Sequence, residues 1–337
     1  MLKNKNYNTF FHIWLISLIF LVSSIIIVGG MTRLTDSGLS ITEWELFKGV
    51  FLPKGPDAWV EYFDLYKKIP QYSLLNSSMT LDEFKYIFLW EYAHRLLARF
   101  IGIFFLIPFL FFVLINFLNK TKIILFTKIF ILILVQGIIG WYMVISGLTE
   151  NVTVSHYRLS IHLFIAFSIL SSLFWTLLNS TNKTEKFFFK FNGYNVYFFL
   201  LSLIYTQIIM GAFVSGLDAG KIYQTWPLMN GNYFPDDTML KNLFNFNLPS
   251  VVQFFHRNIA YLIFFLSIYL GFNIVKKKDT KMYVNFVIFF LIILIQIILG
   301  ISVLITGGSI YLASLHQISS IFLVITTLKL YYSSIRT

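Results

Sequence analysis

The sequence contains no cysteine, which excludes disulfide bonds, thiolate metal sites and cysteine nucleophiles in any compartment. Charge is also scarce, because only 12% of the 337 residues are charged while 57% are hydrophobic, and the mean hydropathy is +0.75. Ordinary soluble domains carry about 25% charged residues. The chain is therefore expected to be a polytopic membrane protein whose main partner is the lipid bilayer.

The net charge of +11 does not indicate a nucleic-acid partner. Binding to a duplex needs basic residues gathered on one face of a folded module. Here the Lys and Arg residues lie in short segments between apolar runs. We therefore expect no nucleic-acid binding.

Eight apolar runs reach the ~20 residues that a helix needs to cross a bilayer. They cover residues 10–31, 96–118, 123–145, 159–178, 195–215, 258–275, 283–306 and 310–330. The first run is longer than the ~7–15 residues of a signal-peptide core, so it is expected to remain as a helix. The pattern predicts an all-α membrane protein with eight transmembrane helices.

Basic residues predict the orientation of these helices. More than half of the 26 Lys and Arg residues lie at the two termini and in three short connections, which are 119–128, 182–190 and 276–281. The same segments contain only Glu185 and Asp279 of the 15 acidic residues. By the positive-inside rule they face the cytoplasm, together with both termini. The long segments 31–91 and 216–250 then lie on the outer side.

The chain shows an internal duplication. Two pairs of segments match: VQGIIGWYMVISGL (135–148) with IQIILGISVLITGG (295–308), and WEYAHRLLARFIGIF (90–104) with VQFFHRNIAYLIFFL (252–266). We predict two pseudo-symmetric four-helix bundles, residues 1–190 and 191–337. Each half has an even number of helices, so both are expected to have the same orientation in the membrane.

Four histidines occupy equivalent places in this repeat. His94 and His256 precede the second helix of each half, and His162 and His316 lie near the start of the fourth. All four are expected at a similar depth near the outer surface. Two histidines on facing bundle helices are an axial-ligand arrangement for a haem iron. One membrane histidine alone is more often a packed or hydrogen-bonded residue, but four equivalent ones favour ligands, and zinc is disfavoured because its structural sites usually take four protein ligands.

An arginine directly follows His94 and another directly follows His256. Arg95 and Arg257 lie near the outer ends of predicted spans, where a guanidinium group can bind lipid phosphates. The alternative is a charge-assisted bond to a haem propionate. Both arginines are therefore candidate cofactor-binding residues.

The two halves differ at one acidic position. Glu91 precedes His94 by three residues and shares its helix face, whereas the equivalent residue before His256 is Gln253. Glu91 could simply pair with Arg95 one turn later. Alternatively, one bundle performs chemistry with Glu91 as a catalytic group while the other holds a redox cofactor.

Several segments together resemble the haem A synthase family of mitochondria and bacteria. They are TRLTDSGLSITEW (32–44), WEYAHRLLAR (90–99), VSHYRLSIHL (154–163), GLDAGKIYQTWPLMNG (216–231), FFHRNIAY (254–261) and LHQ (315–317). They span nearly the whole chain in order. Some members of this family have a cysteine pair in an outer loop, so the chain resembles the cysteine-free subgroup.

The resemblance implies an oxidoreductase of the bacterial cytoplasmic membrane. Such an enzyme oxidises the C8 methyl group of haem O to a formyl group and so makes haem A for cytochrome oxidase. By position, His256 and His316 resemble the axial ligands of a haem b, and His94 and His162 resemble the ligands of the substrate haem. Glu91 stands at the acidic position of the family motif.

Other functions remain alternatives at the level of sequence. A bis-histidine cytochrome that only transfers electrons is expected to have equal halves, which the Glu91/Gln253 difference disfavours. A transporter is expected to have polar groups near the bilayer midplane, whereas here they gather near the outer edge. A haem-delivery or oxidase-assembly factor is a further alternative. Haem O synthase and a second copy of the chain are candidate protein partners.

Overall fold

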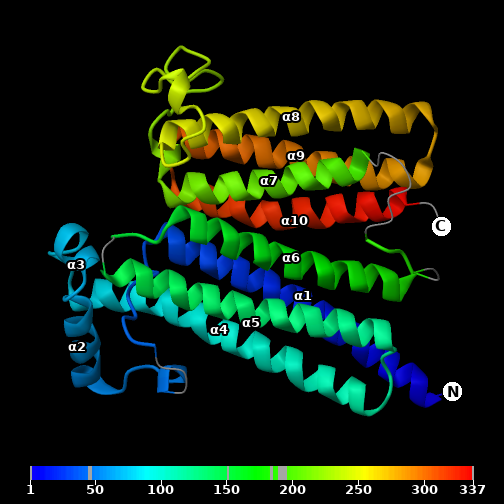
Figure 1. The fold of residues 1–337 in the computed structure, drawn as a ribbon, viewed down its shortest axis with the longest axis horizontal. Helices are drawn as coiled ribbons and strands as arrows, with labels where there is room; N and C mark the ends of the chain where they lie inside the picture. The colour runs from blue at the N-terminus through cyan, green and yellow to red at the C-terminus, as the bar shows by residue number, and fades with distance from the viewer. Residues whose placement is uncertain (1, 45–47, 150–151, 183–184, 189–195, 336–337) are drawn as a thin grey trace. The chain divides into compact units, whose positions relative to one another are not determined.

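The computed structural model describes residues 2–44, 48–149, 152–182, 185–188 and 196–335 (Figure 1). Within these residues the chain is helical and has no β-strand apart from one isolated bridge. The α-helices are α1 (Leu2–Leu34), α2 (Gly55–Tyr66), α3 (Pro70–Leu75), α4 (Leu81–Leu114), α5 (Lys120–Thr149), α6 (His156–Thr181), α7 (Val196–Gly216), α8 (Pro249–Lys276), α9 (Thr280–Ile305) and α10 (Ile310–Ser334). Three short 3₁₀ helices are η1 (Lys48–Val50), η2 (Ala219–Lys221) and η3 (Leu240–Asn242).

Eight helices in the described part of the chain are long and apolar enough to cross a membrane. They are α1 and the seven helices from α4 to α10. This confirms the predicted class, an all-α multi-pass membrane protein. The two short helices, α2 and α3, belong to the segment between the first two spans.

Two of the long helices begin earlier than the apolar runs predicted. The second was expected at 96–118, but α4 begins at Leu81, and the sixth was expected from 258, but α8 begins at Pro249. Thr80 caps α4 by accepting from the Glu83 main-chain N–H, and the Glu83 side chain accepts in return from the Thr80 N–H. An apolar window detects only the membrane-spanning part of a helix. Because α4 begins at Leu81, His94 lies roughly 20 Å along the helix from its first residue, at a rise of about 1.5 Å per residue.

Residues Met1–Ile169 form one compact unit. In it α1 packs against α4, and α4 packs against α5 (Figure 1). The segment containing α2 and α3 covers the first turns of α4 through an aromatic core in which Phe63 stacks on Phe84 at 5.0 Å between ring centroids. Tyr66 is fully buried in this core and binds Gln71 and Asn76 through its hydroxyl. The segment between α1 and α4 (residues 35–80) is therefore fixed to α4 close to the turn that carries Glu91. We name it the first outer segment, and the segment between α7 and α8 (residues 217–248) the second outer segment, after the side of the membrane that the basic residues predict for both.

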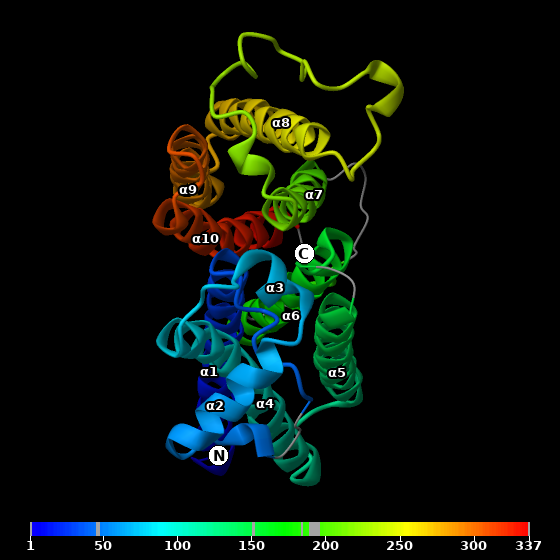
Figure 2. The same ribbon diagram turned by 90° about the vertical axis from the view of Figure 1, so that its left-hand side faces the viewer.

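Residues Leu170–Thr337 form the second compact unit, in which α10 packs against α7 and α9, and α7 packs against α8. The segment between α7 and α8 lies at the ends of these helices (Figure 2). Tyr223 in this segment is buried and donates a hydrogen bond to Asp236. Burial, followed by this bond, raises the pKa of the Tyr223 hydroxyl. Its main chain consequently has a fixed position over the first turns of α8.

Candidate functional site

His94 on α4 and His162 on α6 face each other in the first unit. Their ring centroids are 6.4 Å apart and their planes are inclined by 80°. A metal–imidazole bond is about 2 Å long, and a ring nitrogen lies roughly 1.1 Å from the ring centroid, so two rings on opposite sides of one iron have centroids roughly 6.3 Å apart. The spacing of this pair therefore fits two axial ligands of one haem iron.

The surroundings of His162 also fit a ligand. Its main-chain carbonyl accepts a hydrogen bond of 2.9 Å from the Gln136 amide on α5, which fixes the helix that carries the ring. Its buried Nδ1 has no hydrogen-bond partner among the described residues. An unpaired buried polar atom costs about 1–3 kcal/mol. A group outside the protein chain is therefore expected beside this ring.

The second unit contains the equivalent pair, His256 on α8 and His316 on α10. The buried Nδ1 of each ring has no hydrogen-bond partner in the described part of the chain. Gln207 on α7 donates to the His256 carbonyl at 3.0 Å and its Nε2 lies 3.3 Å from His256 Nε2. Imidazole nitrogens are the commonest protein ligands of haem iron. The donor set of this pair thus fits a bis-histidine haem.

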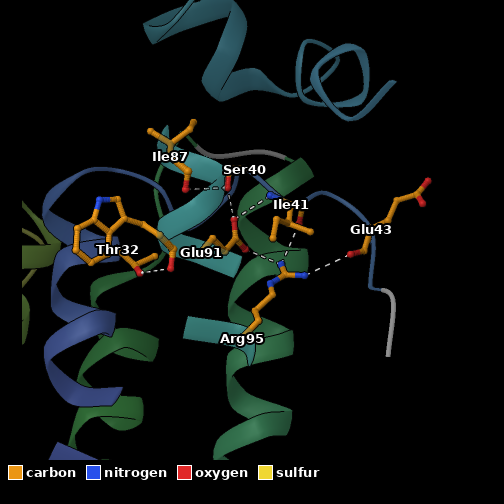
Figure 3. A network of polar contacts seen from close by, with 8 residues as sticks. Thr32, Ser40, Ile41, Glu43, Ile87, Glu91 and Arg95 are labelled. Atoms are coloured by element: carbon orange, nitrogen blue, oxygen red, sulfur yellow. Dashed lines mark hydrogen bonds and ion pairs between the residues drawn. The ribbon is translucent and has the colours of Figure 1, made fainter. Parts of the chain in front are cut away.

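Glu91 is the centre of a buried polar network on α4 (Figure 3). Its side chain is only 3% exposed. One carboxylate oxygen accepts from the Ser40 hydroxyl at 2.7 Å and from the Ile41 N–H at 2.9 Å, and the other accepts from Arg95 at 2.6 Å. We call Ser40, Ile41, Glu91 and Arg95 the Glu91 network. It joins the first outer segment to α4 one turn before His94.

Arg95 binds the first outer segment as well as Glu91. Its guanidinium group donates to the main-chain carbonyls of Ile41 at 2.9 Å and Glu43 at 3.3 Å, and it lies 5.4 Å from the centre of the Trp44 ring. The i,i+4 ion pair expected from the sequence is therefore present, and it belongs to a larger network. These contacts hold the Arg95 charge beside the Glu91 carboxylate, on the residue that follows His94.

The second unit repeats this network without the carboxylate. Gln253 and Arg257 on α8 both donate to the Tyr223 carbonyl, each at 3.0 Å, and Arg257 also donates to the Leu228 carbonyl at 3.3 Å. Gln253 Oε1 and Arg257 Nε are buried and lack hydrogen-bond partners among the described residues. The second outer segment is thus joined to α8 as the first is to α4, but the residue at the position of Glu91 is the uncharged Gln253.

The sequence located the histidines and the Glu91/Gln253 difference but missed the residues that surround them. Nothing in the motifs indicated that Ser40 and Tyr223 supply the partners of Glu91 and Gln253. These partners come from loops distant in sequence, whereas Gln136 was visible inside a duplicated segment. The available signal was that Gln136 recurs as Gln296 at the same position of the duplicated segment.

The fold and these pairs define a multi-pass membrane protein with two histidine pairs. In each unit an outer segment is hydrogen-bonded to the helix that carries one histidine of the pair. Residues 12–328 match the family model described as cytochrome oxidase assembly protein. The chain is 49% identical to the heme A synthase of Pelagibacter ubique over 340 residues, covering 98% of both chains. It is 45% identical to that of Parvibaculum lavamentivorans over 74% of this chain and 73% of the relative. It is 40% identical to the heme A synthase of Rickettsia bellii over 92% of this chain and 94% of the relative. The chain belongs to the haem A synthase family of cytochrome oxidase assembly proteins.

Proposed function

We propose that this protein is a haem A synthase, an oxidoreductase that converts the C8 methyl group of haem O to the formyl group of haem A for cytochrome oxidase. Family membership supports the reaction, since the relatives named above are heme A synthases. The observation that carries the proposal is the spacing of 6.4 Å between the His94 and His162 rings, with a buried carboxylate network one turn away. It fits a haem substrate held beside an acidic group.

In this proposal the two units have different tasks. His94 and His162 hold the iron of the substrate haem in the first unit, and His256 and His316 hold a haem b in the second. A haem b held by this pair would supply one-electron transfer. At the repeat position of Glu91 the second unit has the uncharged Gln253. This agrees with a unit that transfers electrons and does not oxidise the substrate methyl group.

The conversion consists of successive hydroxylations at one carbon. Each replaces a C–H bond by a C–OH bond and is a two-electron oxidation of the substrate, whose oxidant is a co-substrate from outside the chain. Two of them give a geminal diol, which loses water to form the aldehyde. The Glu91 carboxylate already accepts hydrogen bonds from Ser40, Ile41 and Arg95, so taking up a proton would break its pair with Arg95. We therefore propose that Glu91 stabilises positive charge developing on the substrate rather than acting as a proton acceptor.

Arg95 and Arg257 are proposed to contribute positive charge to the propionate ends of the two haems. Main-chain carbonyls of the outer segments hold both guanidinium groups, Ile41 for Arg95 and Tyr223 for Arg257, which supports this role. Arg257 Nε has no hydrogen-bond partner among the residues described, so it is the N–H group proposed to bind a propionate. We place the protein in the cytoplasmic membrane of a bacterium with both termini cytoplasmic, as the distribution of Lys and Arg indicates.

A heterologous conversion assay tests this function. The chain is expressed in a host that makes haem O but no haem A, and the extracted haems are separated by chromatography. Haem A is expected with the wild-type chain and not with an empty vector. A well-expressed protein that binds haem and yields only haem O would support the alternatives, an electron-transfer cytochrome or a haem-delivery protein.

A further inference from the structure

Each of the four histidine rings lies against a glycine on a neighbouring helix. A Cβ atom placed on these glycines would meet the imidazole ring within 3.0–3.3 Å, which is tighter than an ordinary van der Waals contact. The four contacts are Gly29 with His94 at 3.0 Å, Gly140 with His162 at 3.3 Å, Gly211 with His256 at 3.3 Å and Gly300 with His316 at 3.0 Å. Any larger residue at these positions would have to displace the ring or the helix.

A glutamine precedes three of these glycines by one helical turn, in QGIIG, QIIMG and QIILG. Gln136 donates to the His162 carbonyl at 2.9 Å, and Gln207 donates to the His256 carbonyl at 3.0 Å. Gln296 reaches His316 through the Ser319 hydroxyl, which lies 2.5 Å from Gln296 Oε1 and 3.0 Å from the His316 carbonyl. We call the pairs Gln136–Gly140, Gln207–Gly211 and Gln296–Gly300 the Gln-Gly pairs.

The two residues of each pair act on different parts of the same histidine. The glutamine binds its main chain, so the histidine-bearing helix cannot easily move away. The glycine lies at the Cε1 edge of its ring, so a side chain larger than hydrogen at that position would press on this edge. Gly29, which lies against His94, is the exception. The residue four positions before it is Ile25, so no glutamine of this pattern is paired with Gly29.

We propose that the Gln-Gly pairs are positioning residues that fix the plane and depth of His162, His256 and His316 as haem ligands. The inference rests on the proposed function, because the rings are positioned for an iron. Its observable consequence is spectroscopic. The relative orientation of two axial imidazole planes sets the electron paramagnetic resonance lines of a low-spin ferric haem, and ligand geometry together with nearby hydrogen bonds sets its reduction potential.

The purified full-length protein with its haem b provides the test, using Gly211→Ala and Gly300→Ala. Gly137→Ala is the matched control, because Gly137 lies on the transmembrane helix α5 and a Cβ atom placed on it would meet no atom within 4 Å. Alanine ordinarily favours a helix over glycine. The control is therefore expected to keep wild-type resonance lines, reduction potential and haem content, while the two contact variants shift the lines and the potential or lose haem at least several-fold.

Gln207→Leu keeps the test open if Gly211→Ala fails to accumulate, since it removes the hydrogen bond to the His256 carbonyl without adding an atom at the Cε1 edge of the ring. A shifted reduction potential at wild-type haem content supports the proposal. Wild-type spectra and potentials for Gly211→Ala, Gly300→Ala and Gln207→Leu would overturn it. Failure of the proposed function would look different, because the wild-type protein would then form no haem A in the conversion assay, whatever the spectra of the glycine and glutamine variants.

Discussion

Replacing Glu91 by glutamine separates a chemical role of this side chain from a structural one. The change is nearly isosteric and removes one negative charge. A glutamine oxygen can still accept from Ser40 and Ile41, but its amide group then faces the guanidinium group of Arg95, and two donors cannot pair. The substitution therefore removes one charge-assisted hydrogen bond from the Glu91 network.

The structure sets the size of the stability effect. Breaking a buried ion pair costs roughly 3–5 kcal/mol, but Arg95 would keep its bonds to the Ile41 and Glu43 carbonyls. The loss is then about 1.5–3 kcal/mol, the value of a hydrogen bond to a charged group. Gln253 with Arg257 shows that a glutamine and an arginine can bind an outer segment together. We expect Glu91→Gln to fold, with a lower Tm and a normal haem b spectrum.

Conversion of haem O is expected to fall much further, by roughly 10²–10³-fold, as when a preorganised electrostatic contact in an active site is removed. Ser40→Ala is the matched control, because it also removes one hydrogen bond to the Glu91 carboxylate, at the same cost of about 1.5–3 kcal/mol, but leaves the charge in place. Haems extracted from membranes with equal amounts of each variant would be compared by chromatography. Equal loss of conversion in both variants would refute the chemical role and leave Glu91 as a structural link to the first outer segment.

Three further results are expected. His256→Ala and His316→Ala should each abolish the low-spin b-type absorption spectrum of the purified protein, and a retained spectrum in both would contradict the ligand assignment. Gln253→Glu removes the hydrogen bond to the Tyr223 carbonyl and supplies a carboxylate, yet a chain carrying it together with an inactive first unit should form no haem A. Reporter fusions at Lys120 and Asp57 should register the cytoplasm and the outer side respectively, whereas the reverse pattern would invert the proposed topology.

Much of the fold was predictable because it depends on composition and length. Runs of apolar residues long enough to cross a bilayer define eight helices without reference to tertiary contacts, and the described part of the chain has eight such helices. The starts of α4 and α8 were not predictable from apolarity, because their first turns leave the apolar run and depend on local signals such as Thr80 and Pro249. The capping pattern of Thr80 and Glu83 was visible in the sequence but lay outside the apolar runs that define the spans.

The sequence by itself determined the helical membrane class, the pairing of histidines by repeat position and the acidic difference at Glu91, since these follow from residue type and spacing. Tertiary structure alone decided how these residues are surrounded. The 6.4 Å between the His94 and His162 rings depends on the crossing of α4 and α6, and the partners of Glu91 come from a loop some fifty positions earlier. Spacing along a helix predicts which residues share a face. It carries no information on which distant main-chain atoms approach that face, because helix crossing and loop packing are set by the whole core.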